Sequence, residues 1–185
     1  LSAESVVELS FASRDTQGTL LELADAADCE LELTGLVPNA VDGHLAYFAV
    51  SAAAVDAVEA AVAERHADRV RVIPSADGRL LEWVVTDGTV VGTLVDSGAQ
   101  VVSVTAADGV TKAVAEVASD ADGRALVDEV RTAFPETTLV SKRTHDRPVG
   151  RADGISRGTV AELTDRQQEV LETAYRAGYF DWPRA

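Results

Sequence analysis

The sequence predicts an α+β fold built from two ferredoxin-like units in tandem, each with the order βαββαβ. Each unit is expected to place two helices on one face of an antiparallel sheet, and one more α-helix should follow at the C-terminal end. Three observations lead to this fold: the order strand, helix, strand, strand, helix, strand in residues 1–74, the same order in residues 75–145, and short matches between the two stretches. Since internal repetition constrains architecture more strongly than any single element, we expect two similar halves.

The first half is expected to occupy residues 1–74. Val7, Leu9 and Phe11 alternate with polar residues, as in a strand buried on one face. Similar alternation, and apolar residues at helical spacing, define the remaining elements. The expected strands are 6–11, 30–34, 45–50 and 70–73, and the expected helices are 17–28 and 55–66.

The second half is expected to occupy residues 75–145, with a hairpin turn at Asp108-Gly109. Its expected strands are 80–85, 100–105, 111–117 and 138–142, and its expected helices are 89–98 and 124–134. The halves match in short segments: Val7-Glu8-Leu9 with Leu81-Glu82-Trp83, and Gly18-Thr19-Leu20 with Gly92-Thr93-Leu94. Stacking the two sheets face to face would bury acidic strand residues such as Glu8 and Glu32, so one extended sheet is preferred.

The charge of the chain is strongly acidic. It has 185 residues, with 31 acidic and 16 basic ones, a net charge of −15, and only two lysines. Acidic residues spread along the chain are typical of proteins kept soluble in concentrated salt; an acidic binding surface is the alternative. No apolar run approaches the roughly 20 residues of a membrane span, and the single cysteine, Cys29, excludes an internal disulfide. We therefore expect a cytoplasmic protein, with Cys29 packed as a small apolar residue.

A basic stretch follows the last predicted strand. Residues 142–157 contain five basic and two acidic residues, a net of +3, within an otherwise acidic chain. Arg147, Arg151 and Arg157 are candidates for contacts to a DNA backbone, whereas the alternative is a solvated linker. Proline and glycine favour a linker over residues 146–162.

The last segment, residues 163–185, predicts an amphipathic helix. Thr164 is a suitable N-cap with Gln167 placed to close a capping box, and Gly178 is a suitable left-handed C-cap. Its apolar residues recur at helical spacing and require a partner surface. They are Val170, Leu171, Ala174 and Tyr175, followed by Tyr179, Phe180 and Trp182.

Residues Leu163 to Arg184 closely resemble the opening helix of the helix-turn-helix domain in the bacterio-opsin activator (Bat) family of archaeal transcription regulators. Three other segments resemble the domain that lies, in those regulators, between GAF or PAS sensors and the helix-turn-helix. These segments are Cys29 to Pro38, Gly92 to Ala99, and Lys142-Arg143 to Arg147-Pro148.

The resemblance implies a regulatory or interaction domain that links sensor input to a DNA-binding head, by dimerisation or by binding a small effector. DNA would be a partner through the helix-turn-helix of the full-length protein, and a homodimer is expected. Since the chain begins at Leu1 and lacks methionine, we expect it to be a segment of a longer protein. The helix that reads DNA would then lie beyond Ala185.

The residues themselves indicate no chemistry. No nucleophile stands beside a base, and no phosphate-binding loop or metal-ligand spacing is evident, so we predict no catalytic, cofactor-binding or metal-binding residues. His44, His66 and His145 are far apart in sequence and are expected at the surface or at caps. Glu30 and Glu32 share a strand face that could bind a cation or simply be solvated. A small-metabolite enzyme of ferredoxin-like fold is the alternative function.

Two further patterns have structural explanations. Six Asp-Gly pairs are expected to form turns. Their aspartates are Asp42, Asp77, Asp87, Asp108, Asp122 and Asp153. The strand aromatics Tyr47, Phe48 and Trp83 are expected to pack in the core or on a sheet face; a stacking platform for single-stranded RNA is the alternative, which the acidic surroundings oppose.

Overall fold

The computed structural model describes residues 4–14, 19–39, 43–66, 68–76, 78–85 and 88–147, and these residues form an α+β domain of eight strands and four helices. In chain order the elements are β1 (Glu4–Ser13), α1 (Thr19–Ala26), β2 (Leu31–Pro38), β3 (His44–Val50), α2 (Val55–Arg65), β4 (Val70–Ser75), β5 (Gly78–Val85), α3 (Val90–Asp96), β6 (Gln100–Ala107), β7 (Val110–Val117), α4 (Asp120–Ala133) and β8 (Thr137–Arg147). The expected order of elements is confirmed.

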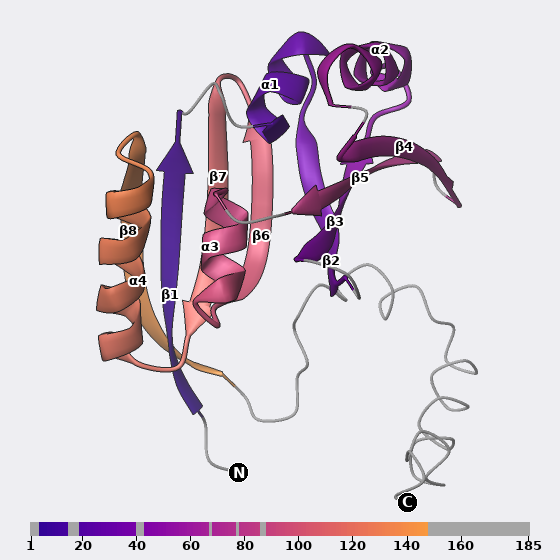
Figure 1. Cartoon of the computed structure of the whole chain (residues 1–185). Coiled ribbons are helices and arrows are strands. Elements are labelled where there is room, and N and C mark those ends of the chain that lie inside the picture. The colour runs from indigo at the N-terminus through magenta and orange to yellow at the C-terminus, as the bar shows by residue number, and fades with distance from the viewer. Residues whose placement is uncertain are drawn as a thin grey trace, which may run out of the picture. The chain divides into compact units, whose positions relative to one another are not determined.

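All eight strands belong to one antiparallel sheet, in the order β4-β5-β3-β2-β6-β7-β1-β8 (Figure 1). The preferred single extended sheet is therefore confirmed over two stacked sheets. The pairing of β2 with β6 at the centre is short, with only two residue pairs, whereas every other neighbouring pair has at least six. The sheet thus consists of two groups of four strands joined by a narrow central contact.

Two strands lie outside the group that their place in the sequence suggests. β1 lies between β7 and β8, among strands of residues 75–145, while β5 lies between β3 and β4, among strands of residues 1–74. The boundary near residue 75 remains a prediction, but strands from its two sides are interleaved in the sheet. Each four-strand group is therefore completed by a strand from the other half of the sequence.

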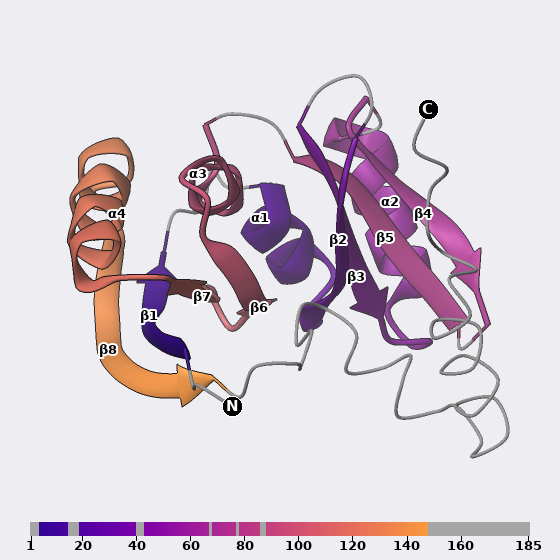
Figure 2. The same cartoon turned by 90° about the horizontal axis from the view of Figure 1, so that it is seen from below.

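One face of the sheet carries the helices and the core. A single cluster of buried apolar side chains includes Leu9, Phe48 and Leu81 from the strands together with buried residues of all four helices. The Phe48 and Trp83 rings lie 6.2 Å apart in this core. Since side chains alternate along a strand, the opposite face carries the remaining strand residues, and none of the four described helices covers it (Figure 2).

Two of the six expected Asp-Gly turns can be compared with the structure, because Asp42, Asp77, Asp87 and Asp153 lie outside the described residues. Asp108 and Gly109 both have positive φ, 51° and 69°, as the predicted hairpin turn requires. The prediction was wrong for Asp122-Gly123, which lies in the first turn of α4. Ser119 caps this helix by accepting a hydrogen bond from the Asp122 amide, 3.2 Å away. A Cβ at Gly123 would lie 3.5 Å from the Val7 and Val117 side chains, an ordinary van der Waals distance, so this position packs against the sheet without requiring glycine.

Helix α4 and strand β8 are longer than predicted. α4 begins at Asp120 rather than residue 124, because Ser119 supplies the N-cap. β8 continues to Arg147 rather than ending at residue 142, because β1 pairs with it as far as Glu4. The predicted linker after residue 147 and the predicted helix 163–185 lie outside the described residues. Within the described part, no helix has both the length and the apolar character needed to cross a membrane.

Candidate functional site

The basic residues near the end of β8 do not form one surface. Lys142 lies on the helix side, where its Nζ is 3.2 Å from Asp120 Oδ1 at the start of α4. The Lys142 ammonium lowers the pKa of the Asp120 carboxyl, with a smaller contribution from Arg124. Arg143 follows on the opposite face, and Arg147 is the last residue of β8. Arg151 and Arg157 lie outside the described residues, so their proposed DNA contacts stay predictions.

Among the histidines, His66 caps a helix as expected. It follows the last residue of α2, and its Nε2 is 3.1 Å from Glu22 Oε2 on α1. Arg65 also donates to Glu22, and this hydrogen bond is the main reason that the pKa of Glu22 is lowered. These contacts tie α1 to α2. His44, the first residue of β3, is half-buried.

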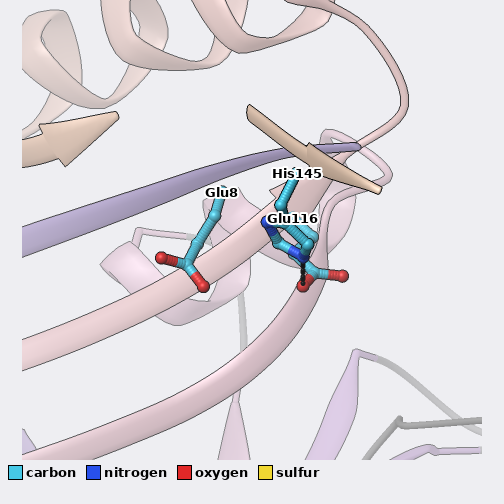
Figure 3. A group of neighbouring side chains, drawn as sticks. All are labelled: Glu8, Glu116 and His145. Atoms are coloured by element: carbon cyan, nitrogen blue, oxygen red, sulfur yellow. Dashed lines mark ion pairs between the residues drawn. The ribbon is translucent and has the colours of Figure 1, made fainter. Parts of the chain in front are cut away.

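The third histidine belongs to a cluster on the helix-free face. Glu8, Glu116 and His145 each offer a ligand atom, and these atoms all lie within 4.8 Å of one another. His145 Nε2 is 3.3 Å from Glu116 Oε1. Figure 3 shows the three side chains together on the side of the sheet away from the helices. We call Glu8, Glu116 and His145 the acid-histidine cluster.

Strand register brings this cluster together from three neighbouring strands. On β7, Glu116 lies directly opposite Glu8 of β1, and on β8, His145 lies opposite Val6, two residues before Glu8. Val6 shares the face of Glu8 and is only 5% exposed. The Glu116 side chain is 11% exposed, whereas His145 is 43% exposed. One side of the cluster is therefore shielded and the imidazole side is open to solvent.

Chemically, this cluster could hold a cation. Two carboxylates and one imidazole are donors that suit divalent transition metals, and three protein ligands leave positions open for water. Like charges directly opposite one another in a sheet repel. A positive charge beside Glu8 and Glu116 would therefore reduce the repulsion between these two carboxylates. No ion pair joins Arg143 to Glu8 within the described part, although the two lie opposite in register.

The corresponding place in the other strand group is arranged differently. Glu82 of β5 lies opposite Tyr47 of β3 and Arg71 of β4. Arg71 Nε donates to Glu82 Oε1 at 2.5 Å, and the hydrogen bond between Tyr47 and Glu82 raises the pKa of the Tyr47 phenol. Ile73 stands at the position of His145, since it lies opposite Leu80 as His145 lies opposite Val6. We call Tyr47, Glu82 and Arg71 the closed counterpart, because one acid, one base and one phenol satisfy each other.

A second candidate site is a groove of about 430 Å³ between the end of α1 and the β6–β7 turn. Acidic residues dominate its lining, including Asp25, Asp28, Glu30 and Asp108, with Cys29 beside them. Asp25 Oδ1 accepts a hydrogen bond from the Gly109 amide at 3.2 Å. Burial raises the pKa of the Cys29 thiol, which is half-buried against the core as expected of a packed apolar residue.

The acid-histidine cluster is not evident from the sequence. His145 is far in sequence from Glu8 and from the other histidines, whereas Glu30 and Glu32 are two residues apart. Both Glu30 and Glu32 are exposed, and neither belongs to a potential metal-ligand group in the described residues. One signal was available in the internal repeat. Glu8 matches Glu82, so the residues that pair with these two glutamates in the sheet could be compared, and they differ.

Known proteins resemble the chain along its whole length. Residues 4–172 match the family described as "BAT: GAF and HTH_10 associated domain", and residues 163–185 match "HTH_10: HTH DNA binding domain". A "Putative transcriptional regulator" of Haloferax volcanii is 39% identical over 186 residues, covering 100% of this chain and 32% of that protein. The "Bacterioopsin transcriptional activator" of Halobacterium salinarum is 25% identical over 203 residues, covering 100% of this chain and 28% of that protein.

The chain therefore spans about a third of the length of these curated relatives. Both relatives come from halophilic archaea, in agreement with the salt-adapted interpretation of the net charge of −15. No solved structure matches the chain.

Proposed function

The chain belongs to the BAT family of GAF and HTH_10 associated domains, and from this membership we propose that it is the regulatory domain of a DNA-binding helix-turn-helix transcription regulator. The domain would link sensor input to the DNA-binding head. The observation that carries this proposal is the chain order: the last described strand, β8, ends at Arg147, and the residues matching the DNA-binding domain begin at 163. A change at β8 is thus only a short stretch of chain away from those residues.

The first way in which a signal could reach this domain is the binding of a small effector molecule. The groove of about 430 Å³ is within the size range of small-molecule sites, and it lies beside the narrow contact between the strand groups. Its acidic lining suits a polar ligand with positive charge. A ligand there would contact α1 and the β6–β7 turn together, and so could change how the two groups are joined.

Homodimerisation is the second route. Both edge strands carry features that oppose pairing with a second copy: β4 is short and contains Pro74, and the middle of β8 carries Lys142 and Arg143. A dimer would therefore use the helix-free face, where apolar side chains such as Leu45 and Leu80 are half-buried. No arrangement of residues in the described part specifically favours the alternative of a small-metabolite enzyme.

We also propose that each four-strand group is one ferredoxin-like unit with an exchanged first strand. In such a unit the first strand lies between the third and the fourth. β5 occupies this place between β3 and β4, and β1 occupies it between β7 and β8. The first strand of each unit would then lie in the sheet of the other unit.

DNA binding by the full-length protein tests the regulatory proposal. We expect it to bind promoter DNA, even in high salt, and expect truncation after residue 162 to abolish specific binding. Replacing Arg147, Arg151 and Arg157 with alanine should weaken binding similarly on all sequences and reduce its salt dependence, as phosphate contacts do. A truncated protein that still protects a defined site would contradict the proposal.

The two routes of input can be separated with this chain. A ligand that binds the folded domain raises its midpoint of thermal unfolding, so a panel of small cationic and polar metabolites should yield at least one shift. Sedimentation in high salt reports the dimer. A dimer with no response to any metabolite would favour regulation by dimerisation.

A further inference from the structure

We propose that the acid-histidine cluster, Glu8, Glu116 and His145, binds a divalent transition-metal cation, with Zn²⁺ or Mn²⁺ as representative ions. The proposal rests first on geometry. Three neighbouring strands each contribute one donor, and the donor atoms lie within 4.8 Å of one another before any ion is bound. Metal–ligand bonds of about 2.0–2.2 Å require the three donor atoms to lie closer together than this limit, so side chains of the cluster would move inward on binding.

The second argument is the chemistry of the donor set. An imidazole favours transition metals over Mg²⁺ and Ca²⁺, which prefer oxygen ligands alone. The two carboxylates would neutralise a divalent charge, and the Glu116 side chain, at 11% exposure, has little solvent to screen it. A cation between the carboxylates would relieve the repulsion of the cross-strand pair Glu8 and Glu116.

The third argument comes from the closed counterpart in the other strand group. There the acidic residue Glu82 is retained, but Tyr47 replaces the second carboxylate and Ile73 replaces the imidazole. Arg71 then satisfies Glu82 directly. The same framework therefore has one donor of the three in one group and all three in the other. Folding of the sheet does not require the donor set, since the counterpart folds without it.

The location of the cluster near the end of β8 suggests a regulatory role for the cation, and this step rests on the proposed function. His145 lies two residues before the end of β8, from which the chain continues to the residues that match the DNA-binding domain. A bound cation would join the end of β8 to β1 and β7. It would thereby hold the start of the connecting segment, and metal occupancy would act as an effector signal.

Zn²⁺ binding by the 185-residue chain tests the site. Titration calorimetry should show one saturable Zn²⁺ site, and Co²⁺ should give an absorption spectrum with an imidazole ligand. His145→Ile copies the residue at the matching position in the other group and should weaken Zn²⁺ binding at least about tenfold without loss of fold. Glu116→Tyr copies Tyr47, the residue at the matching position in the other group, and should also weaken Zn²⁺ binding.

His66→Gln is the matched control, because His66 also contacts a carboxylate but lies at the α1–α2 contact. Binding should persist unchanged in this variant. The proposal is overturned if the wild-type chain binds no Zn²⁺, or if His145→Ile binds it as tightly as the wild type. Loss of binding in His66→Gln alone would place the ion elsewhere and would also overturn it.

The effector role is tested in the full-length protein by measuring DNA affinity with Zn²⁺ and with a chelator. A change that is absent in His145→Ile supports the role. Zn²⁺ binding without any effect on DNA affinity would overturn the effector role alone, whereas absence of DNA binding under all conditions would count against the proposed function instead.

Discussion

The two strand groups show how one framework can hold either a satisfied polar contact or an open donor set. In one group, Glu82 lies between Tyr47 and Arg71 and is bound by both. In the other, Glu8 has the same place in its strand but lies opposite a second carboxylate, Glu116, with His145 nearby. The backbone pairing is alike, so two side chains account for the difference. Chemistry on this sheet is therefore set by cross-strand neighbours rather than by the fold.

The largest effect expected is on the shared core. Leu9 follows Glu8 on β1 and Leu81 precedes Glu82 on β5, and both leucines are 0% exposed. Leu9→Ala and Leu81→Ala should each lower the free energy of unfolding by about 2–5 kcal/mol. Since both residues belong to one buried cluster, each variant should shift a single transition in denaturant, followed by circular dichroism. Two separate transitions, with only one shifted by each variant, would show that the groups unfold independently.

The next effect distinguishes the two acidic residues. Glu82→Gln should cost about 1–3 kcal/mol, because the charge-assisted contact between the buried Glu82 carboxylate and the exposed Arg71 guanidinium is lost. Glu8→Gln should change stability by less than about 0.5 kcal/mol, or raise it, because it removes a like-charge neighbour of Glu116. Both values come from denaturant unfolding without added metal. Equal losses in the two variants would mean that Glu8 is satisfied as Glu82 is.

A smaller effect concerns the phenol of the closed counterpart. Tyr47→Phe should cost about 0.5–1 kcal/mol near neutral pH. The hydrogen bond to Glu82 raises the pKa of Tyr47, so the folded state holds this proton more tightly than the unfolded state. The stabilisation is complete below the unfolded value of about 10 and is lost as pH rises through the folded pKa.

The difference between wild type and Tyr47→Phe should therefore shrink above about pH 10. Absorbance of ionised tyrosine gives a second measurement, because the chain has three tyrosines and the substitution should remove one whose pKa is raised. Loss of an early-titrating tyrosine instead would contradict the assigned contact.

The smallest effect is at the edge of the other group. Lys142→Gln should return the pKa of Asp120 toward its usual range, because the lysine is the largest cause of its lowering. A lowered carboxyl pKa contributes stability that is present above the unfolded pKa and lost as pH falls through the folded one. The variant should accordingly lose less stability on acidification. NMR titration of the Asp120 carboxyl measures the shift, with Lys112→Gln as a control outside this ion pair.

Local patterns in the sequence were sufficient to predict the helices and strands, but not to predict which strands pair with each other. Alternation along β1 and β5 revealed both strands, yet Val7-Glu8-Leu9 and Leu81-Glu82-Trp83 present the same pattern to any partner. Either strand would suit either place in the sheet. The interleaving of β1 and β5 depends on pairing between residues distant in sequence, which alternation does not encode.

The acid-histidine cluster could not be predicted because it also depends on pairing between residues distant in sequence. Arg143 to Arg147 is a polar run with no apolar alternation, and so resembled the start of a linker. Pairing with β1 extends the strand through this run despite its composition, and that pairing places His145 beside Glu116. Long-range register, rather than local propensity, determines where this histidine lies.

The interleaved strands have a consequence for biosynthesis. β1 leaves the ribosome first, but both of its partners in the sheet, β7 and β8, are made more than 90 residues later. Strands β3 and β4 in turn lack the strand that joins them until β5 emerges. The apolar strand β1 must therefore stay unpaired until β7 and β8 are made, and contacts this distant in sequence make folding slow. The many acidic residues of the chain, through mutual repulsion, would help keep such an unfinished chain from associating with others.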